Sequence, residues 1–123
     1  MKDIFGVCLS GLCVMHCLLT PLLLLFGSAG AFGIWLESAW VHYALLAPIS
    51  LLLVWSLPFA WSKHRQSKPL LVGAGGFSAL VLSLFVPETL EPILAIAGSL
   101  LLITAHLLNR HLLKIVTQPT KDQ

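Results

Sequence analysis

The sequence predicts an all-α integral membrane protein, a bundle of four transmembrane helices. Hydrophobic residues make up 58% of the 123 residues and charged residues only 10%, and the mean hydropathy is +0.94. A soluble domain carries about 25% charged residues, so that class is excluded. Four apolar runs are each long enough to cross a bilayer at 1.5 Å per residue. We expect one domain, residues 1–123, with helices at about 4–26, 41–61, 70–86 and 93–113.

The first apolar run, residues 4–26, contains all three cysteines and Pro21. A secretory signal is an alternative, because Lys2 precedes the run and Ala29-Gly30-Ala31 has the form of a cleavage site. The run is longer than a signal core and holds a histidine and a proline, so we interpret it as a permanent helix. Pro21 lacks the amide that would bond the Cys17 carbonyl, which predicts a kink and a freed oxygen there.

The other three runs are separated by polar segments of different charge. The second run, 41–61, ends in the basic loop 62–69. The third run, 70–86, is rich in glycine, alanine and serine, which allow a neighbouring helix to approach closely. The proline-bounded acidic segment 87–92 predicts a tight turn before the fourth run, 93–113.

The basic residues predict the orientation of the bundle. Lys and Arg in short loops stay on the cytoplasmic side of a membrane. All seven fall on one side of the predicted bundle, whereas the other two connections contain Glu37, Glu88 and Glu91. Both termini are therefore expected in the cytoplasm. The seven are Lys2, Lys63, Arg65, Lys68, Arg110, Lys114 and Lys121.

The candidate chemistry lies in the middle of the first run. On a helix, Cys13, His16 and Cys17 share one face within an arc of about 100°. Thiolates and imidazole are the ligands that zinc, copper(I) and other soft cations select. Three cysteines in one run do not form a disulfide framework. Cys8 lies off the shared face and is expected to act as a small hydrophobic residue.

A histidine on the fourth run is expected near this face. At 1.5 Å per residue, Cys13 lies about 14 Å and His106 about 9 Å above the inner boundary of the membrane. These depths allow one metal site between the two helices, although an interhelical hydrogen bond explains His106 equally well. The predicted ligands are Cys13, His16, Cys17 and His106.

A second polar group is expected on the outer side. His42 begins the second run near Glu37, and an interfacial position explains it better than ligation does. Carboxylates on that side would nevertheless attract cations. The members of this group are Glu37, His42, Glu88 and Glu91. His64 and His111 lie in basic stretches and are expected to be solvated.

The pattern Ser10-x-x-Cys13-x-x-His16-Cys17-x-x-x-Pro21 opens a small four-helix membrane protein. It resembles the MerC family of bacterial inner-membrane proteins, with Asn109-Arg110-His111 as weaker support. The resemblance implies a multi-pass inner-membrane protein that passes mercuric ions through paired cysteines. The family's pair is spaced Cys-x-x-Cys, with further cysteines near the carboxyl end. Here His16 takes the position three after Cys13 and the carboxyl end has no cysteine, so the mixed set also suits zinc.

We therefore expect a heavy-metal ion transporter for Hg²⁺ or Zn²⁺ and not an enzyme. The metal ion is the substrate, and no organic cofactor or nucleic-acid partner is expected. Lipid surrounds the helices, and a homodimer would help four short helices enclose a pathway. One alternative is a membrane thiol redox protein, although helical i,i+4 cysteines have poor disulfide geometry. Another is a metal-sensing accessory subunit.

Overall fold

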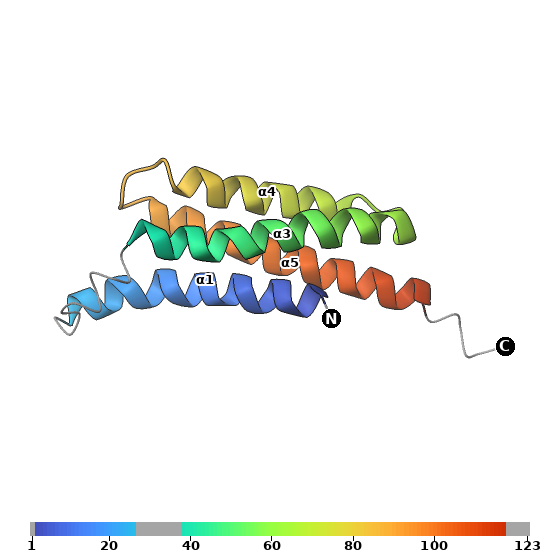
Figure 1. Ribbon diagram of the computed structural model, residues 1–123, viewed down its shortest axis with the longest axis horizontal. Helices are drawn as coiled ribbons and strands as arrows, with labels where there is room; N and C mark the ends of the chain where they lie inside the picture. The colour runs from blue at the N-terminus through green and yellow to red at the C-terminus, as the bar shows by residue number, and fades with distance from the viewer. Residues whose placement is uncertain (1, 27–37, 118–123) are drawn as a thin grey trace.

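The computed structural model describes residues 2–26 and 38–117, and within them it contains helices and no strand. Neighbouring helices run antiparallel in a single up-and-down bundle (Figure 1). This arrangement confirms the predicted all-α class. Each helix begins two residues before the run predicted for it. The helices are α1 (Lys2–Leu25), α3 (Ala39–His64), α4 (Lys68–Ser83) and α5 (Glu91–Thr117).

Three of these helices are long and apolar enough to cross a membrane, namely α1, α3 and α5. Helix α4 has 16 residues, which is about 24 Å of helix and less than a usual span. The chain is thus a membrane protein in which α4 is shorter than the other three described helices. The prolines inside α3, at positions 48 and 58, do not end the helix, and α1 likewise continues through Pro21.

Large apolar side chains cover the outside of the bundle. Leu25, Trp40 and Phe85 are each more than three-quarters exposed, and many other leucines and aromatic residues point outward. Lipid is as apolar as leucine, so these side chains gain nothing by turning inward. Small and polar residues fill the interior instead, where helices can approach one another closely.

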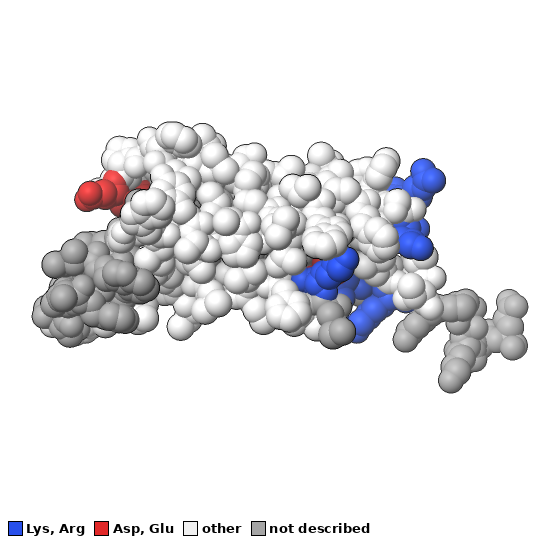
Figure 2. Space-filling view, viewed as in Figure 1, with Lys and Arg blue, Asp and Glu red and all other residues white. Residues whose placement is uncertain are grey.

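Charged side chains collect at opposite ends of the bundle (Figure 2). The basic end is where α1 begins and α5 ends, and it carries Lys2, Lys63, Arg65, Lys68, Arg110 and Lys114. The acidic end carries Glu88 and Glu91 in the turn between α4 and α5. That turn is closed by the amides of Leu90 and Glu91, which donate to the Pro87 carbonyl at 2.9 and 3.1 Å. Glu37 and Lys121 lie outside the described residues.

Helices α4 and α5 cross at a pair of glycines. A Cβ atom on Gly76 would lie 2.7 Å from the Gly98 carbonyl oxygen, and one on Gly98 would lie 2.7 Å from the Gly76 oxygen. Gly73 in the same helix faces the Leu57 side chain in the same close way. The small residues of α4 are therefore packing residues, as their composition predicts.

This crossing predicts a sharp difference between two neighbouring glycines. Gly76→Ala places a methyl group against backbone and should destabilise the bundle by roughly 1–3 kcal/mol. The matched control is Gly75→Ala, because a methyl group there meets nothing within 4 Å among the described residues. It should be neutral or stabilising by up to about 1 kcal/mol, since alanine favours helix. The stability of both variants can be measured by the loss of helical circular dichroism as the SDS fraction of mixed micelles rises. Equal stability of the two variants would contradict the close crossing of α4 and α5 at Gly76.

Candidate functional site

The buried face of α1 is a stripe of small and polar residues. Its described buried residues follow one another at intervals of three or four, which is the spacing of a helix-packing seam. This stripe faces α5, with which α1 packs most extensively. The stripe contains no aliphatic side chain, while the leucines of α1 point outward. Its members, hereafter the α1 stripe, are Asp3, Gly6, Ser10, Cys13 and Cys17.

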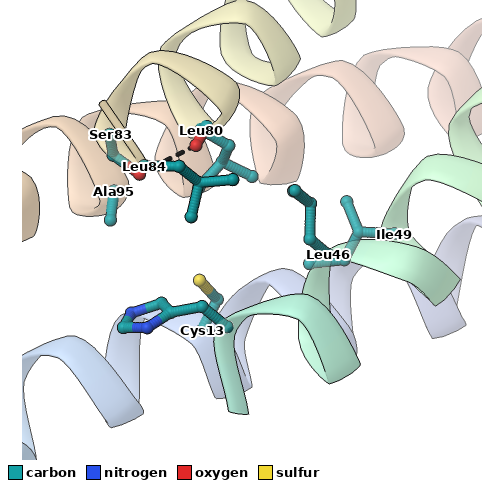
Figure 3. A pocket seen from close by; sticks show the side chains of 8 residues that line it. Cys13, Leu46, Ile49, Leu80, Ser83, Leu84 and Ala95 are labelled. Atoms are coloured by element: carbon teal, nitrogen blue, oxygen red, sulfur yellow. Dashed lines mark hydrogen bonds between the residues drawn. The ribbon is translucent and has the colours of Figure 1, made fainter. Parts of the chain in front are cut away.

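Two free thiols lie side by side in the stripe. Cys13 and Cys17 are 4% and 6% exposed and lie one helical turn apart on the same buried face. The Cys13 sulfur projects into a cavity of about 10 Å³ between the helices (Figure 3), which is about the space of one water molecule or one ion. The cavity is otherwise mostly apolar. Its lining residues are Cys13, His42, Leu46, Ile49, Leu80, Ser83, Leu84 and Ala95.

Two histidines and a glutamate lead from the thiols to the acidic end. The His16 and His42 rings meet edge to face with their centroids 5.1 Å apart. His42 Nε2 lies 3.3 Å from a carboxylate oxygen of Glu91. His16 Nε2 is enclosed and has no hydrogen-bond partner among the described residues. Helices α1, α3 and α5 thus each contribute one of these three side chains.

Cys13 and Cys17 lie together in the α1 stripe. His16 precedes Cys17 on the same helix but lies outside the stripe, half-buried and against the His42 ring. His106 lies apart from all three, because its ring packs on Gly6, seven residues and about 10 Å along the helix from Cys13. Among the described residues, no three His, Cys, Asp or Glu side chains form a ready metal site.

His106 belongs to a second polar group at the basic end. One oxygen of Asp3, Oδ1, accepts hydrogen bonds from Ser56 Oγ at 2.9 Å and Asn109 Nδ2 at 3.0 Å. His106 Nδ1 lies 3.1 Å from the same oxygen. All four residues are buried, so this group, hereafter the Asp3 cluster, joins α1, α3 and α5 inside the bundle. The interhelical hydrogen bond that the sequence left open for His106 is therefore present.

Sequence reasoning missed the partners that come from other helices. The sequence analysis gave Asp3 no role, and an acidic residue in the first turn of a helix is common. His42 and Glu91 are close only because α3 and α5 meet at the acidic end. A usable signal existed on α5, where Ser99, His106 and Asn109 repeat at intervals of seven and three and so share one face.

The Asp3 cluster predicts a large stability effect. Asp3→Ala removes one acceptor and leaves three buried donors without it, which should cost roughly 2–4 kcal/mol. A suitable control is Ser78→Ala, because the exposed Ser78 hydroxyl only donates to its own helix, to the Ala74 carbonyl. SDS unfolding of both variants measures the difference. An Asp3→Ala protein as stable as the control would show that the cluster does not hold the helices together.

The comparisons with known proteins agree with the motif in α1. The model of a family described as MerC mercury resistance protein matches residues 3–111. This range contains the α1 stripe, both histidines near the thiols and the whole Asp3 cluster. No curated protein and no solved structure matches the chain.

Proposed function

The chain belongs to the MerC mercury resistance protein family, and from that premise we propose that it carries Hg²⁺ or Zn²⁺ across the inner membrane through Cys13, His16 and Cys17. The observation that carries the proposal is the pair of adjacent thiols on the inner face of α1. Polar residues on the inner face of a membrane helix usually mark a functional site, and α1 turns its thiols inward and its leucines outward. Two free thiols on one buried face suit a soft divalent ion.

The polar residues suggest an order of capture. With the acidic end outside, as the basic residues predict, Glu91 and His42 meet an incoming cation first. His16 Nε2 is the next donor, since it has no described partner and lies beside His42. Cys17 follows, and Cys13 lies one turn deeper. For a soft ion, affinity rises from carboxylate to imidazole to thiolate, so each exchange is favourable.

The proton balance of the thiol step is simple. As each metal–sulfur bond forms, one thiol loses its proton, so binding between two sulfurs releases two protons for one divalent ion. The cavity at Cys13 leaves room for the ion with little movement of the packed helices. An incomplete ligand set favours passage, because a fully coordinated site would hold the ion as a structural metal.

The two buried thiols predict a clear loss of binding and uptake. Measured in a Cys8→Ser background, which removes the exposed third thiol, Cys13→Ser/Cys17→Ser should abolish stoichiometric Hg²⁺ binding in detergent and reduce Hg²⁺ uptake into proteoliposomes to the level of empty vesicles. The matched control is Cys8→Ser, because Cys8 is exposed on the outside of the bundle. It should bind and transport like the unaltered chain.

Three results bear directly on this proposal. Uptake that survives in the double variant would remove the thiols from the pathway. Equal binding by the double variant and the unaltered chain would place the metal elsewhere. Binding without any uptake would assign the chain to metal sensing or storage instead of transport.

The capture step predicts that the two glutamates of the acidic end differ. Glu91→Gln removes the carboxylate that faces His42 at 3.3 Å, and it should lower uptake at limiting metal by at least about threefold. Glu88→Gln removes an equal charge from an exposed position and serves as control. Initial rates at low and saturating Hg²⁺ separate the effects, since a capture defect disappears at saturation. An equal effect of both variants would reduce the role of Glu91 to general charge attraction.

A further inference from the structure

We propose that the Asp3 cluster is a second metal-binding site, built from oxygen and nitrogen ligands, which receives a divalent cation from the thiols and releases it at the basic end. The inference rests on the proposed function. It adds a site that the cysteine motif does not contain, and it gives His106 a metal role apart from the thiols. The ligands would be the Asp3 carboxylate and the His106 imidazole, with the Asn109 amide oxygen and the Ser56 hydroxyl completing the set.

The spacing of the cluster is close to that of the ligands of a small divalent ion. Ligand atoms at 2.0–2.2 Å from a tetrahedral zinc ion lie about 3.3–3.6 Å from one another, so the partners of Asp3 Oδ1 would move outward by a few tenths of an ångström. The Asp3 Oδ1 to His106 Nδ1 distance is 3.1 Å, and the Asn109 and Ser56 atoms lie 3.0 and 2.9 Å from the same oxygen. An ion can enter among these atoms without any loss of protons if Ser56 turns its hydroxyl hydrogen away and His106 takes the tautomer that carries its proton on Nε2. Asn109 offers its oxygen when the amide turns over, because its two ends have nearly the same shape.

Two buried hydroxyl groups lie on the route between the sites. Ser10 and Ser99 are both 0% exposed, and neither hydroxyl has a hydrogen-bond partner among the described residues. Such groups are rare in folded proteins and often mark an ion or a water molecule. Ser10 lies between Cys13 and Gly6 on α1, and Ser99 lies two turns before His106 on α5. They offer oxygen contacts to an ion that leaves the thiols for the Asp3 cluster.

The chemistry of the transfer balances. Each sulfur takes up one proton as its bond to the ion breaks, so two protons enter and one M²⁺ leaves, with no electron transferred. The ion then meets the Asp3 carboxylate and the His106 imidazole. A soft ion binds such a set less tightly than two thiolates, which makes the cluster a place of release. Repulsion by the basic residues near it also lowers the affinity of the cluster for a cation.

The decisive experiment uses a variant without thiols, Cys8→Ser/Cys13→Ser/Cys17→Ser, titrated with Zn²⁺ and with Co²⁺ in detergent. We expect one bound ion per chain, with the visible absorption of tetrahedral Co²⁺. Adding His106→Gln, which keeps a donor for Asp3, should weaken binding by at least about tenfold. No bound ion in the thiol-free chain, or equal binding after His106→Gln, would overturn the second site.

A pair of glycines tests the same site without removing a ligand. A Cβ atom on Gly6 would lie 2.5–2.7 Å from three ring atoms of His106, so Gly6→Ala must displace the imidazole. Gly11→Ala meets no described atom within 4 Å on the same helix and is the control. In the thiol-free background, Zn²⁺ affinity should fall for Gly6→Ala and stay unchanged for Gly11→Ala. Equal affinity in both variants would count against ligation by His106.

Uptake measurements separate this inference from the proposed function. With the thiols present, His106→Gln should load Hg²⁺ on the cysteines as the unaltered chain does, yet transport it at least about tenfold more slowly. Equal uptake by both proteins would overturn only the second site. Failure of the unaltered chain to transport would overturn the proposed function, while the Zn²⁺ titration would still decide whether the Asp3 cluster binds metal.

Discussion

The bundle depends on one constraint, which is that a membrane interior offers no water to a buried polar group. Every such group must therefore find a partner on another helix or on a ligand. The α1 stripe meets this constraint at its two ends in different ways. At the basic end, Asp3 has three partners from α3 and α5. Around Cys13 and Cys17 the partners are incomplete, and the unsatisfied donors and acceptors gather there. The same stripe thus has one satisfied end, which holds the helices together, and one unsatisfied end, which can take a ligand.

The four described helices contribute differently to these polar groups. Helix α5 contacts all three others and supplies a residue to each polar group, Glu91 at one end and His106 at the other. Helix α3 does the same with His42 and Ser56. Helix α4 is short, packs on α5 through glycine and closes the cavity with leucines. Because α1 and α4 scarcely touch, the region around the thiols is bounded by α3 and α5 more than by direct packing of α1 on α4.

Local properties of the sequence predict the fold, but they predict only part of the candidate site. Length and hydropathy predict the helices, and the spacing of Cys13, His16 and Cys17 predicts their common face. Depth along the membrane was less reliable, because counting residues ignores tilt and the true ends of helices. His106 was expected near Cys13 and lies about two turns away, against Gly6. The contacts of Asp3, and of His42 with Glu91, join distant parts of the chain. No local pattern specifies such pairs.

The Asp3 cluster also constrains the order in which the helices can pack during synthesis. Its hydrogen bonds join residues 53, 103 and 106 positions apart in the chain. When α1 enters the bilayer during synthesis, neither Ser56, His106 nor Asn109 yet exists. Burying the carboxylate alone is too costly, so it must stay near the headgroups until α5 has been synthesised. Helix α1 therefore docks late, because the group around Asp3 can close only after Asn109 has been added to the chain.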